Sequence, residues 1–455
     1  MSNLISRIYS FIGLNKGSER AKMVKRNALA SLIIKLGSMF IDFAKVPVLL
    51  TYLLQENYGV FLTITSIVAW THRFDFGLGA GLRYKLTAAI SQRDNYYGKR
   101  LVSTAYISLS VIMLIAFIII SPIITQLNWN HILNSQSNTS SELMTCVILV
   151  IVVFFIQFVL ELISIVLQAN QRAAVSTIFK PIANLFTLLS IIIIRHYSFN
   201  SLYIACLTMT LPIVVVLFFA NVYLFTKQYK SIAPSLKDFD KKCIKDIYSL
   251  GLKYFIGSVS SLIIFNTASF LITYFINPKA TTIYNTAWTY FGIVVLLNTM
   301  VLQPLVAAIT DAYIKDDISW IKNCFIKICR YSLLLTFISL IMLAFSQIAF
   351  HLWVGDKIII PWGLSIAMTV FFIGNIWSSP FQNFLTGVGK QNVMVALSCI
   401  KILIFIPVSI VFIKSWGLIG LVSSILLVNT IPNILVGILQ FNLIINKKAK
   451  GIWDR

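Results

Sequence analysis

Long apolar segments separated by short polar ones run along almost the whole chain. About 20 consecutive apolar residues are enough for an α-helix to cross the hydrocarbon core of a bilayer. The pattern predicts twelve membrane-spanning helices, at residues 28–54, 58–82, 100–124, 142–167, 174–195, 201–226, 250–276, 280–306, 328–351, 361–386, 391–414 and 416–442. The fold class that follows is an all-α polytopic membrane protein.

Two short sequence matches indicate that the helical array contains a duplicated unit. Residues 50–53 (LTYL) are similar to residues 272–275 (ITYF), and residues 86–91 (LTAAIS) are similar to residues 305–310 (LVAAIT). A unit with an even number of spans keeps its orientation when it is duplicated, so we expect two pseudo-symmetric six-helix bundles around a central cavity. The expected domains are an N-terminal segment (1–27), two bundles (28–226 and 250–442), a linker (227–249) and a tail (443–455).

The charge content and its distribution agree with a membrane protein. Charged residues make up 11% of the chain, against about 25% in soluble globular proteins, which argues against a water-soluble enzyme. The net charge is +22, but the basic residues lie in short clusters between apolar segments, which is not the pattern of a nucleic-acid surface. If both termini are cytoplasmic, 29 Lys and Arg fall in inside segments or near the inside ends of spans, and four fall in outside loops or at the outside ends of spans, as the positive-inside rule requires.

Motifs for catalysis, metal binding or nucleotide binding are missing from the sequence. No C-x-x-C pair occurs among the six cysteines, and the four histidines are scattered. Residues 77–81 lack the glycine spacing of a dinucleotide loop, and residues 387–390 lack the upstream glycine of a phosphate-binding loop. We therefore expect no catalytic residues, no metal site and no bound cofactor.

Ionisable residues inside the predicted spans are the best candidates for function, because each costs ~2.5–3.5 kcal/mol at a helix centre. The candidates for a substrate cavity are Lys35, Asp42, Lys45, Glu161, Lys180 and Lys401. Their spacing places Asp42 and Lys45 on one side of the first span, and Glu161 and Lys180 near the same ends of antiparallel neighbours. Structural salt links between helices remain an alternative. These deep charges are net positive, which favours an anionic group as the ligand.

One segment resembles a known family. Residues 70–91 read WTHRFDFGLGAGLRYKLTAAIS, similar to the W-x4-D-x-G-L-G-x-G-L-R segment of Wzx-type polysaccharide flippases, which belong to the multidrug/oligosaccharidyl-lipid/polysaccharide exporter superfamily. The motif residues are Trp70, Arg73, Asp75, Gly77, Gly79, Gly81 and Arg83. At the cytoplasmic end of the second span they would border the entry of a lipid diphosphate. A basic membrane anchor with a glycine packing seam is the structural alternative.

The resemblance implies a flippase without enzymatic activity. Its substrate would be an undecaprenyl-diphosphate-linked oligosaccharide, the repeat unit of O-antigen or a related polysaccharide in lipopolysaccharide biosynthesis. The protein would move it across the bacterial inner membrane by alternating access, with H⁺ or Na⁺ as the coupling ion. Membrane lipids, a polysaccharide polymerase and a chain-length regulator are the implied partners. A multidrug exporter, a membrane-embedded O-antigen polymerase and a channel are the rival interpretations.

Overall fold

A computed structural model of the chain describes residues 19–69, 78–135, 138–170, 172–194, 201–245, 247 and 265–454. These residues form helices and connecting segments, and none of them lies in a β-strand. Their contacts divide them into two compact units, one with residues 23–282 and the other with residues 283–454 and the few residues before 23. The predicted all-α fold class is confirmed.

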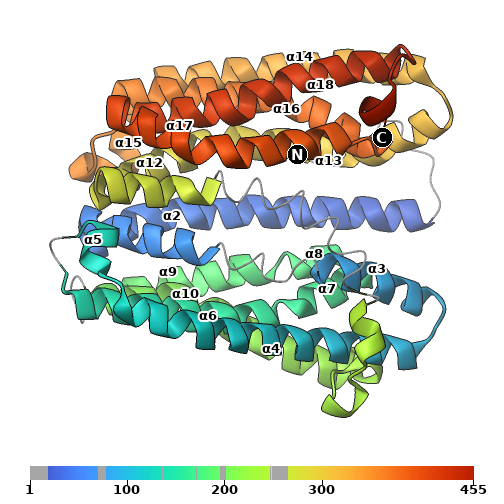
Figure 1. Cartoon of the computed structure of the whole chain (residues 1–455), viewed down its shortest axis with the longest axis horizontal. Helices are drawn as coiled ribbons and strands as arrows, with labels where there is room; N and C mark the ends of the chain where they lie inside the picture. The colour runs from blue at the N-terminus through green and yellow to red at the C-terminus, as the bar shows by residue number, and fades with distance from the viewer. Residues whose placement is uncertain are drawn as a thin grey trace. The chain divides into compact units, whose positions relative to one another are not determined.

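The first unit contains most of the long helix α2 and all helices up to the middle of the chain (Figure 1). They are α2 (Glu19–Ala69), α3 (Leu78–Ser91), α4 (Asn95–Gln126), α5 (Trp129–Leu133), α6 (Ser140–Leu160), α7 (Leu162–Ala169), α8 (Ala173–Ser176), α9 (Phe179–Ile194) and α10 (Leu202–Tyr223). A π-helix, η2 (Leu224–Gln228), and two 3-10 turns, η3 (Lys230–Ile232) and η4 (Leu236–Asp238), follow, and residues 265–275 are helical.

The second unit is built from the later helices (Figure 1). They are α12 (Pro278–Phe291), whose first turn still belongs to the first unit, α13 (Ile293–Ile314), α14 (Ile318–Ala344), α15 (Ser346–Val354), α16 (Trp362–Val388), α17 (Asn392–Ile425) and α18 (Ile431–Ile445). The short elements are η5 (Gly355–Lys357), the π-helix η6 (Leu426–Thr430) and η7 (Gly451–Asp454).

Single residues with positive φ separate helices that the hydropathy pattern predicts as neighbouring spans. Helix α2 breaks at Leu54, where φ is 60° and ψ is 172°, between the predicted spans 28–54 and 58–82. Helix α17 breaks in the same way at Gly417, where φ is 58°, one residue after the predicted start of the span 416–442. One residue outside the helical region is enough to redirect a chain, so neither connection needs a loop.

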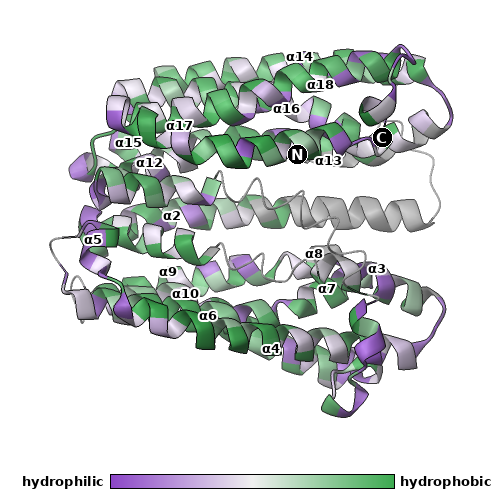
Figure 2. Cartoon of the chain, in the orientation of Figure 1, coloured by the Kyte–Doolittle hydropathy of each residue, from purple (hydrophilic) through white to green (hydrophobic). Residues whose placement is uncertain are grey.

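Seven helical segments among the described residues are long and apolar enough to cross a membrane, which identifies a multi-pass membrane protein. They are Leu36–Val68, Asn95–Gln126, Ser140–Ala169, Leu202–Gln228, Ile318–Ala344, Trp362–Val388 and Asn392–Ile445. Figure 2 shows hydrophobic residues along these helices and hydrophilic ones mainly at their ends. Helix α14 begins ten residues before its predicted span because it continues beyond its apolar part, with Asp317 capping Trp320 N at 3.0 Å.

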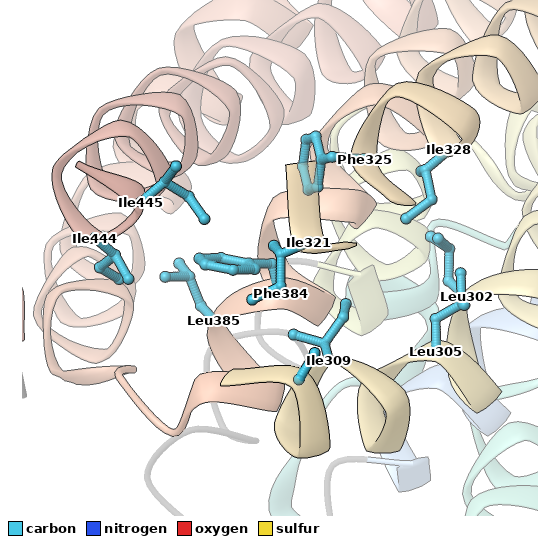
Figure 3. Packing of buried hydrophobic residues seen from close by; sticks show 11 residues of the cluster. Leu302, Leu305, Ile309, Ile321, Phe325, Ile328, Phe384, Leu385, Ile444 and Ile445 are labelled. Carbon is cyan, nitrogen blue, oxygen red and sulfur yellow. The ribbon is translucent and has the colours of Figure 1, made fainter. Parts of the chain in front are cut away.

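A close-packed core joins α13, α14, α16 and α18 of the second unit. Figure 3 shows Ile309, Ile321 and Phe384 pointing toward one another. Where α13 crosses α16, the Thr310 hydroxyl donates to the carbonyl oxygen of Gly387 at 2.7 Å. A Cβ on Gly387 would lie 3.0 Å from both the Ile309 side chain and a backbone oxygen. Glycine therefore allows these two helices to approach closely.

A group of polar contacts in the first unit joins the part of α2 that follows the break at Leu54 to residues 273–282. The Thr282 hydroxyl donates to the carbonyl oxygen of Gln55 at 2.7 Å, and the Thr63 and Thr273 hydroxyls hydrogen-bond to each other. A Cβ on Gly59 would lie 1.8 Å from the Pro278 oxygen. The matched sequences 50–53 and 272–275 thus occupy equivalent places, each ending a helix just before the chain turns.

Candidate functional site

Asp42, Lys45 and Asn184 form a closed polar group between α2 and α9. Lys45 Nζ lies 2.7 Å from Asp42 Oδ1, one turn away on the same helix. Asn184 Nδ2 donates to Asp42 Oδ1 at 2.9 Å, and Lys45 Nζ donates to Asn184 Oδ1 at 3.0 Å. The carboxylate, the ammonium and the amide therefore satisfy one another inside apolar helices, which offsets part of the cost of burying the two charges.

Lys180 and Glu161 extend this group into a chain of four charges. Lys180 is exposed on α9, one turn before Asn184. It interacts electrostatically with Lys45 on α2 and with Glu161, at the junction of α6 and α7. The structure thus brings together four of the six predicted cavity residues. Sequence spacing indicated the Asp42–Lys45 pair, whereas the role of Asn184 in binding both of them depends on the packing of α9 against α2.

The remaining predicted residues fall into two groups. The side chain of Lys35, although its backbone is part of α2, lies outside the described residues, as do Trp70, Arg73, Asp75 and Gly77 of the motif. Lys401 lies in the second unit and is buried, with 4% of its surface exposed. Its Nζ donates to Asn429 Oδ1 at 3.3 Å and to Asn433 Oδ1.

The described end of the motif packs against two separate segments of the first unit. A Cβ on Gly81 would lie 1.9 Å from the carbonyl oxygen of Ile247. Arg83, two residues later, points its guanidinium at Gln168 on α7, at 3.4 Å, and Thr87 lies 3.4 Å from the Ala169 oxygen. Gly79 is at the start of the same helix, α3. The motif therefore positions α3 on α7 and leaves the Arg83 side chain exposed.

The described part of the predicted linker, residues 227–245, is folded against α4. Arg100 pairs with Asp240, and Lys99 Nζ lies 2.9 Å from Asp238 Oδ2. The backbone N–H of Asp240 donates to the Thr104 hydroxyl at 3.0 Å. Hydropathy does not predict this surface, although two aspartates in the linker and a Lys-Arg pair at the start of α4 are a signal for it. Because both ends of the contact are polar, hydropathy could not assign its position.

The described residues offer no group of three His, Cys, Asp or Glu side chains that could hold a metal ion. The candidate site consists instead of an ion-paired lysine and aspartate, a bridging asparagine, and a second lysine that interacts electrostatically with a glutamate, all on apolar helices. Charged groups of this kind inside membrane helices are typical of transport pathways. Fold and site together define a multi-pass membrane transporter.

The chain belongs to a family described as polysaccharide biosynthesis protein, which matches residues 24–311. It is also similar to a protein of Yersinia pseudotuberculosis named "Putative O-antigen export protein", with 20% identity over 366 residues, covering 78% of this chain and 81% of that protein. The resemblance to polysaccharide flippases is thereby confirmed, and the protein is a transporter of the multidrug/oligosaccharidyl-lipid/polysaccharide exporter (MOP) superfamily, not an enzyme.

Solved transporters share the fold. An inward-facing multidrug resistance MATE family transporter of the MOP superfamily matches with a TM-score of 0.71 and 16% identity, covering 92% of this chain and 95% of that one. An outward-facing structure of such a transporter matches with a TM-score of 0.66 and 16% identity, over 97% and 99% of the two chains. A MOP superfamily transporter from Pyrococcus furiosus, whose binding pocket is described as having reversed polarity, matches with a TM-score of 0.64, 16% identity and the same coverage.

Proposed function

We propose that this transporter moves undecaprenyl-diphosphate-linked oligosaccharide repeat units of O-antigen or a related surface polysaccharide from the cytoplasmic to the periplasmic leaflet. Transport would use alternating access driven by a gradient of H⁺ or Na⁺. The family match and the similarity to an O-antigen export protein support this substrate class. The protein would lie in the bacterial inner membrane with both termini in the cytoplasm, where its 29 inside Lys and Arg would face an anionic leaflet.

The observation that carries the proposal is the position of Lys180 between the Asp42–Lys45 ion pair and the half-buried carboxyl group of Glu161. Asp42 is already bound by Lys45 and Asn184, so its charge is compensated locally. Lys180 is exposed, and its electrostatic partner Glu161 is more deeply placed. A diphosphate carries more negative charge than one carboxylate and accepts several hydrogen bonds. It would therefore compete with Glu161 for Lys180.

This competition suggests how substrate binding and ion binding are coupled. When the diphosphate binds Lys180, Glu161 loses a compensating charge in a medium of low dielectric constant. A carboxylate in that situation favours binding of a proton or a Na⁺ ion. Departure of the substrate restores the Glu161–Lys180 interaction and releases the ion. The oligosaccharide would then pass to a polysaccharide polymerase and a chain-length regulator.

The test is a clean deletion in the native host, followed by extraction of lipid-linked sugars. Their leaflet is determined by oxidation with membrane-impermeant periodate in spheroplasts. We expect single repeat units protected on the cytoplasmic side and loss of the surface polysaccharide. Single units that reach the outer face but are not lengthened would identify a polymerase defect and contradict the proposal. An unchanged polysaccharide with altered drug tolerance would contradict it in favour of a multidrug exporter.

Complementation of the deletion tests the role of Lys180. Lys180→Gln removes the cation and should restore little polysaccharide, whereas Lys414→Gln, an exposed lysine on α17, should restore the normal amount. Equal restoration by both variants, at equal levels in the membrane, would contradict the assignment of Lys180. A protease-sensitive tag at the C terminus should be protected in intact spheroplasts, and digestion there would overturn the expected topology.

A further inference from the structure

Lys401 is a buried cation held only by amide groups among the described residues of the second unit. Its Nζ donates to the side-chain oxygens of Asn429 and Asn433, and 4% of its surface is exposed. Asn429 belongs to the π-helix η6, and Asn433 lies in the first turn of α18. Single π-turns within α-helices are frequent at functional sites. The two acceptors therefore come from one irregular stretch that faces α17.

Within the part of the chain that the structure describes, the helices packed against α17 carry no counter-charge for this lysine. They are α16, η6 and α18, and none of the three contains an acidic or basic residue or a tyrosine. The short element η7 also contacts α17, but its Asp454 is paired with Lys390. Along α17 itself the other titratable residues are Cys399 and Lys414, both exposed.

An amide is suited to both protonation states of a lysine. Its oxygen accepts from an ammonium, and its nitrogen donates to the lone pair of a neutral amine. A carboxylate could do only the first, and it would hold the lysine in the charged state. Asn433 Nδ2 already lies 3.4 Å from Asn429 Oδ1, so the two amides can reorient together around Nζ. Burial disfavours the charged form of a lysine, so a buried lysine can lose its proton more easily than an exposed one.

We propose that Lys401 is a proton-exchanging group of the second unit, which takes up a proton from water on one side of the membrane and releases it to water on the other. In the release step one N–H bond of the ammonium breaks and its proton passes to water. The electron pair left on Nζ then accepts a hydrogen bond from Asn429 or Asn433. The proposal identifies the proton as a coupling ion. It rests on the proposed function only for the identity of the substrate that is moved.

The experiment measures charge displacement without substrate. Full-length protein in liposomes of phosphatidylethanolamine and phosphatidylglycerol is adsorbed on a solid-supported membrane and exposed to pH jumps. The wild-type protein should give a transient current, and Lys401→Met should lose at least half of the displaced charge. Lys414→Met, a change of an exposed lysine on the same helix, should keep the wild-type signal. A Lys401→Met current equal to the wild-type current would overturn the proposal.

Two further variants keep the result interpretable if Lys401→Met folds poorly. Lys401→Arg retains a cation that does not release its proton, so the same charge should be lost while the protein stays folded. Asn429→Asp is nearly isosteric and places a carboxylate at the ammonium, which should move the midpoint of the displacement upward by ~1–3 pH units. An unchanged midpoint in Asn429→Asp would overturn the proposal.

This measurement is independent of the substrate assignment, because no glycan is present. Loss of the current in Lys401→Met together with a polymerase or exporter phenotype in the deletion strain would support proton exchange and reject the proposed substrate. A deletion strain that accumulates cytoplasmic repeat units, together with currents unaffected by Lys401→Met, would support the flippase and reject Lys401 as the proton-exchanging group.

Discussion

Asn184 on α9 donates its side-chain amide to Asp42 on α2 at 2.9 Å, across 142 residues of sequence. Its oxygen accepts from Lys45 at 3.0 Å, so one asparagine contacts both members of an ion pair that the sequence places one turn apart. This contact holds α2 and α9 together one turn from Lys180, which interacts electrostatically with Lys45. Its removal should therefore affect transport more than insertion.

The first prediction concerns Asn184→Leu. The substitution keeps the approximate volume but removes both hydrogen bonds to a partly buried ion pair, and a typical hydrogen bond contributes about 0.5–1.5 kcal/mol. We expect loss of surface polysaccharide in a complemented deletion strain, with the variant still present in the membrane. Asp42→Ala should give the same phenotype. Leu185→Ala, at the exposed neighbouring position on α9, is the control, and normal polysaccharide with Asn184→Leu would refute the role of the group.

The second prediction concerns Gly81. A methyl group there would meet the Ile247 carbonyl oxygen at 1.9 Å, whereas one at Gly37, also within a helix, would meet nothing within 4 Å. Overpacking of this kind costs about 1–3 kcal/mol. Gly81→Ala should lower the thermal unfolding midpoint of the purified protein, measured by intrinsic fluorescence in detergent. Gly37→Ala should not lower it, and equal midpoints for the two variants would contradict the close contact.

The third prediction concerns the folded linker. Asp240 accepts from Arg100 and from the backbone N–H of Lys242, and its ion pair is mostly buried. Asp240→Ala should release the linker, and trypsin should cleave after Lys241 or Lys242 about tenfold faster, which corresponds to ~1.4 kcal/mol.

A matched ion pair serves as the control for this linker experiment. Lys447 and Asp316 lie 2.6 Å apart with side chains 66% exposed, and exposed pairs contribute little. Asp316→Ala should therefore leave cleavage after Lys447 unchanged. A cleavage rate at Lys241 and Lys242 that Asp240→Ala leaves unaltered would show that the linker is held by other contacts.

The fourth prediction concerns the break in α2. Leu54 has φ of 60° and ψ of 172°, a region that costs a non-glycine residue about 1–3 kcal/mol. Its side chain is 58% exposed, so little packing is lost on truncation. Leu54→Gly should raise the thermal midpoint or leave it unchanged. Leu53→Gly, at a helical position with no exposed surface, should lower it clearly, and the reverse order would contradict the break.

The sequence by itself determined the helical class, the limits of several spans and one local charge pair. Hydropathy is a property of consecutive residues, and it located α4, α6 together with α7, α10 and α16 to within five residues. A spacing of three along one helix was enough to pair Asp42 with Lys45. The similar sequences at 50–53 and 272–275 indicated that two helices end in the same way. Each is a local pattern within a single helix, so it is visible in the sequence.

Only the tertiary structure decided the contacts between elements. Asn184 reaches Asp42, Asn429 and Asn433 reach Lys401, and Arg100 pairs with Asp240. Each of these contacts depends on which faces of two helices, or of a helix and the linker, meet. Many polar residues along the chain were equally available as partners, and periodicity within one helix does not choose among them. The choice was made by close packing, where residues such as Gly59, Gly81 and Gly387 allow particular backbones to touch.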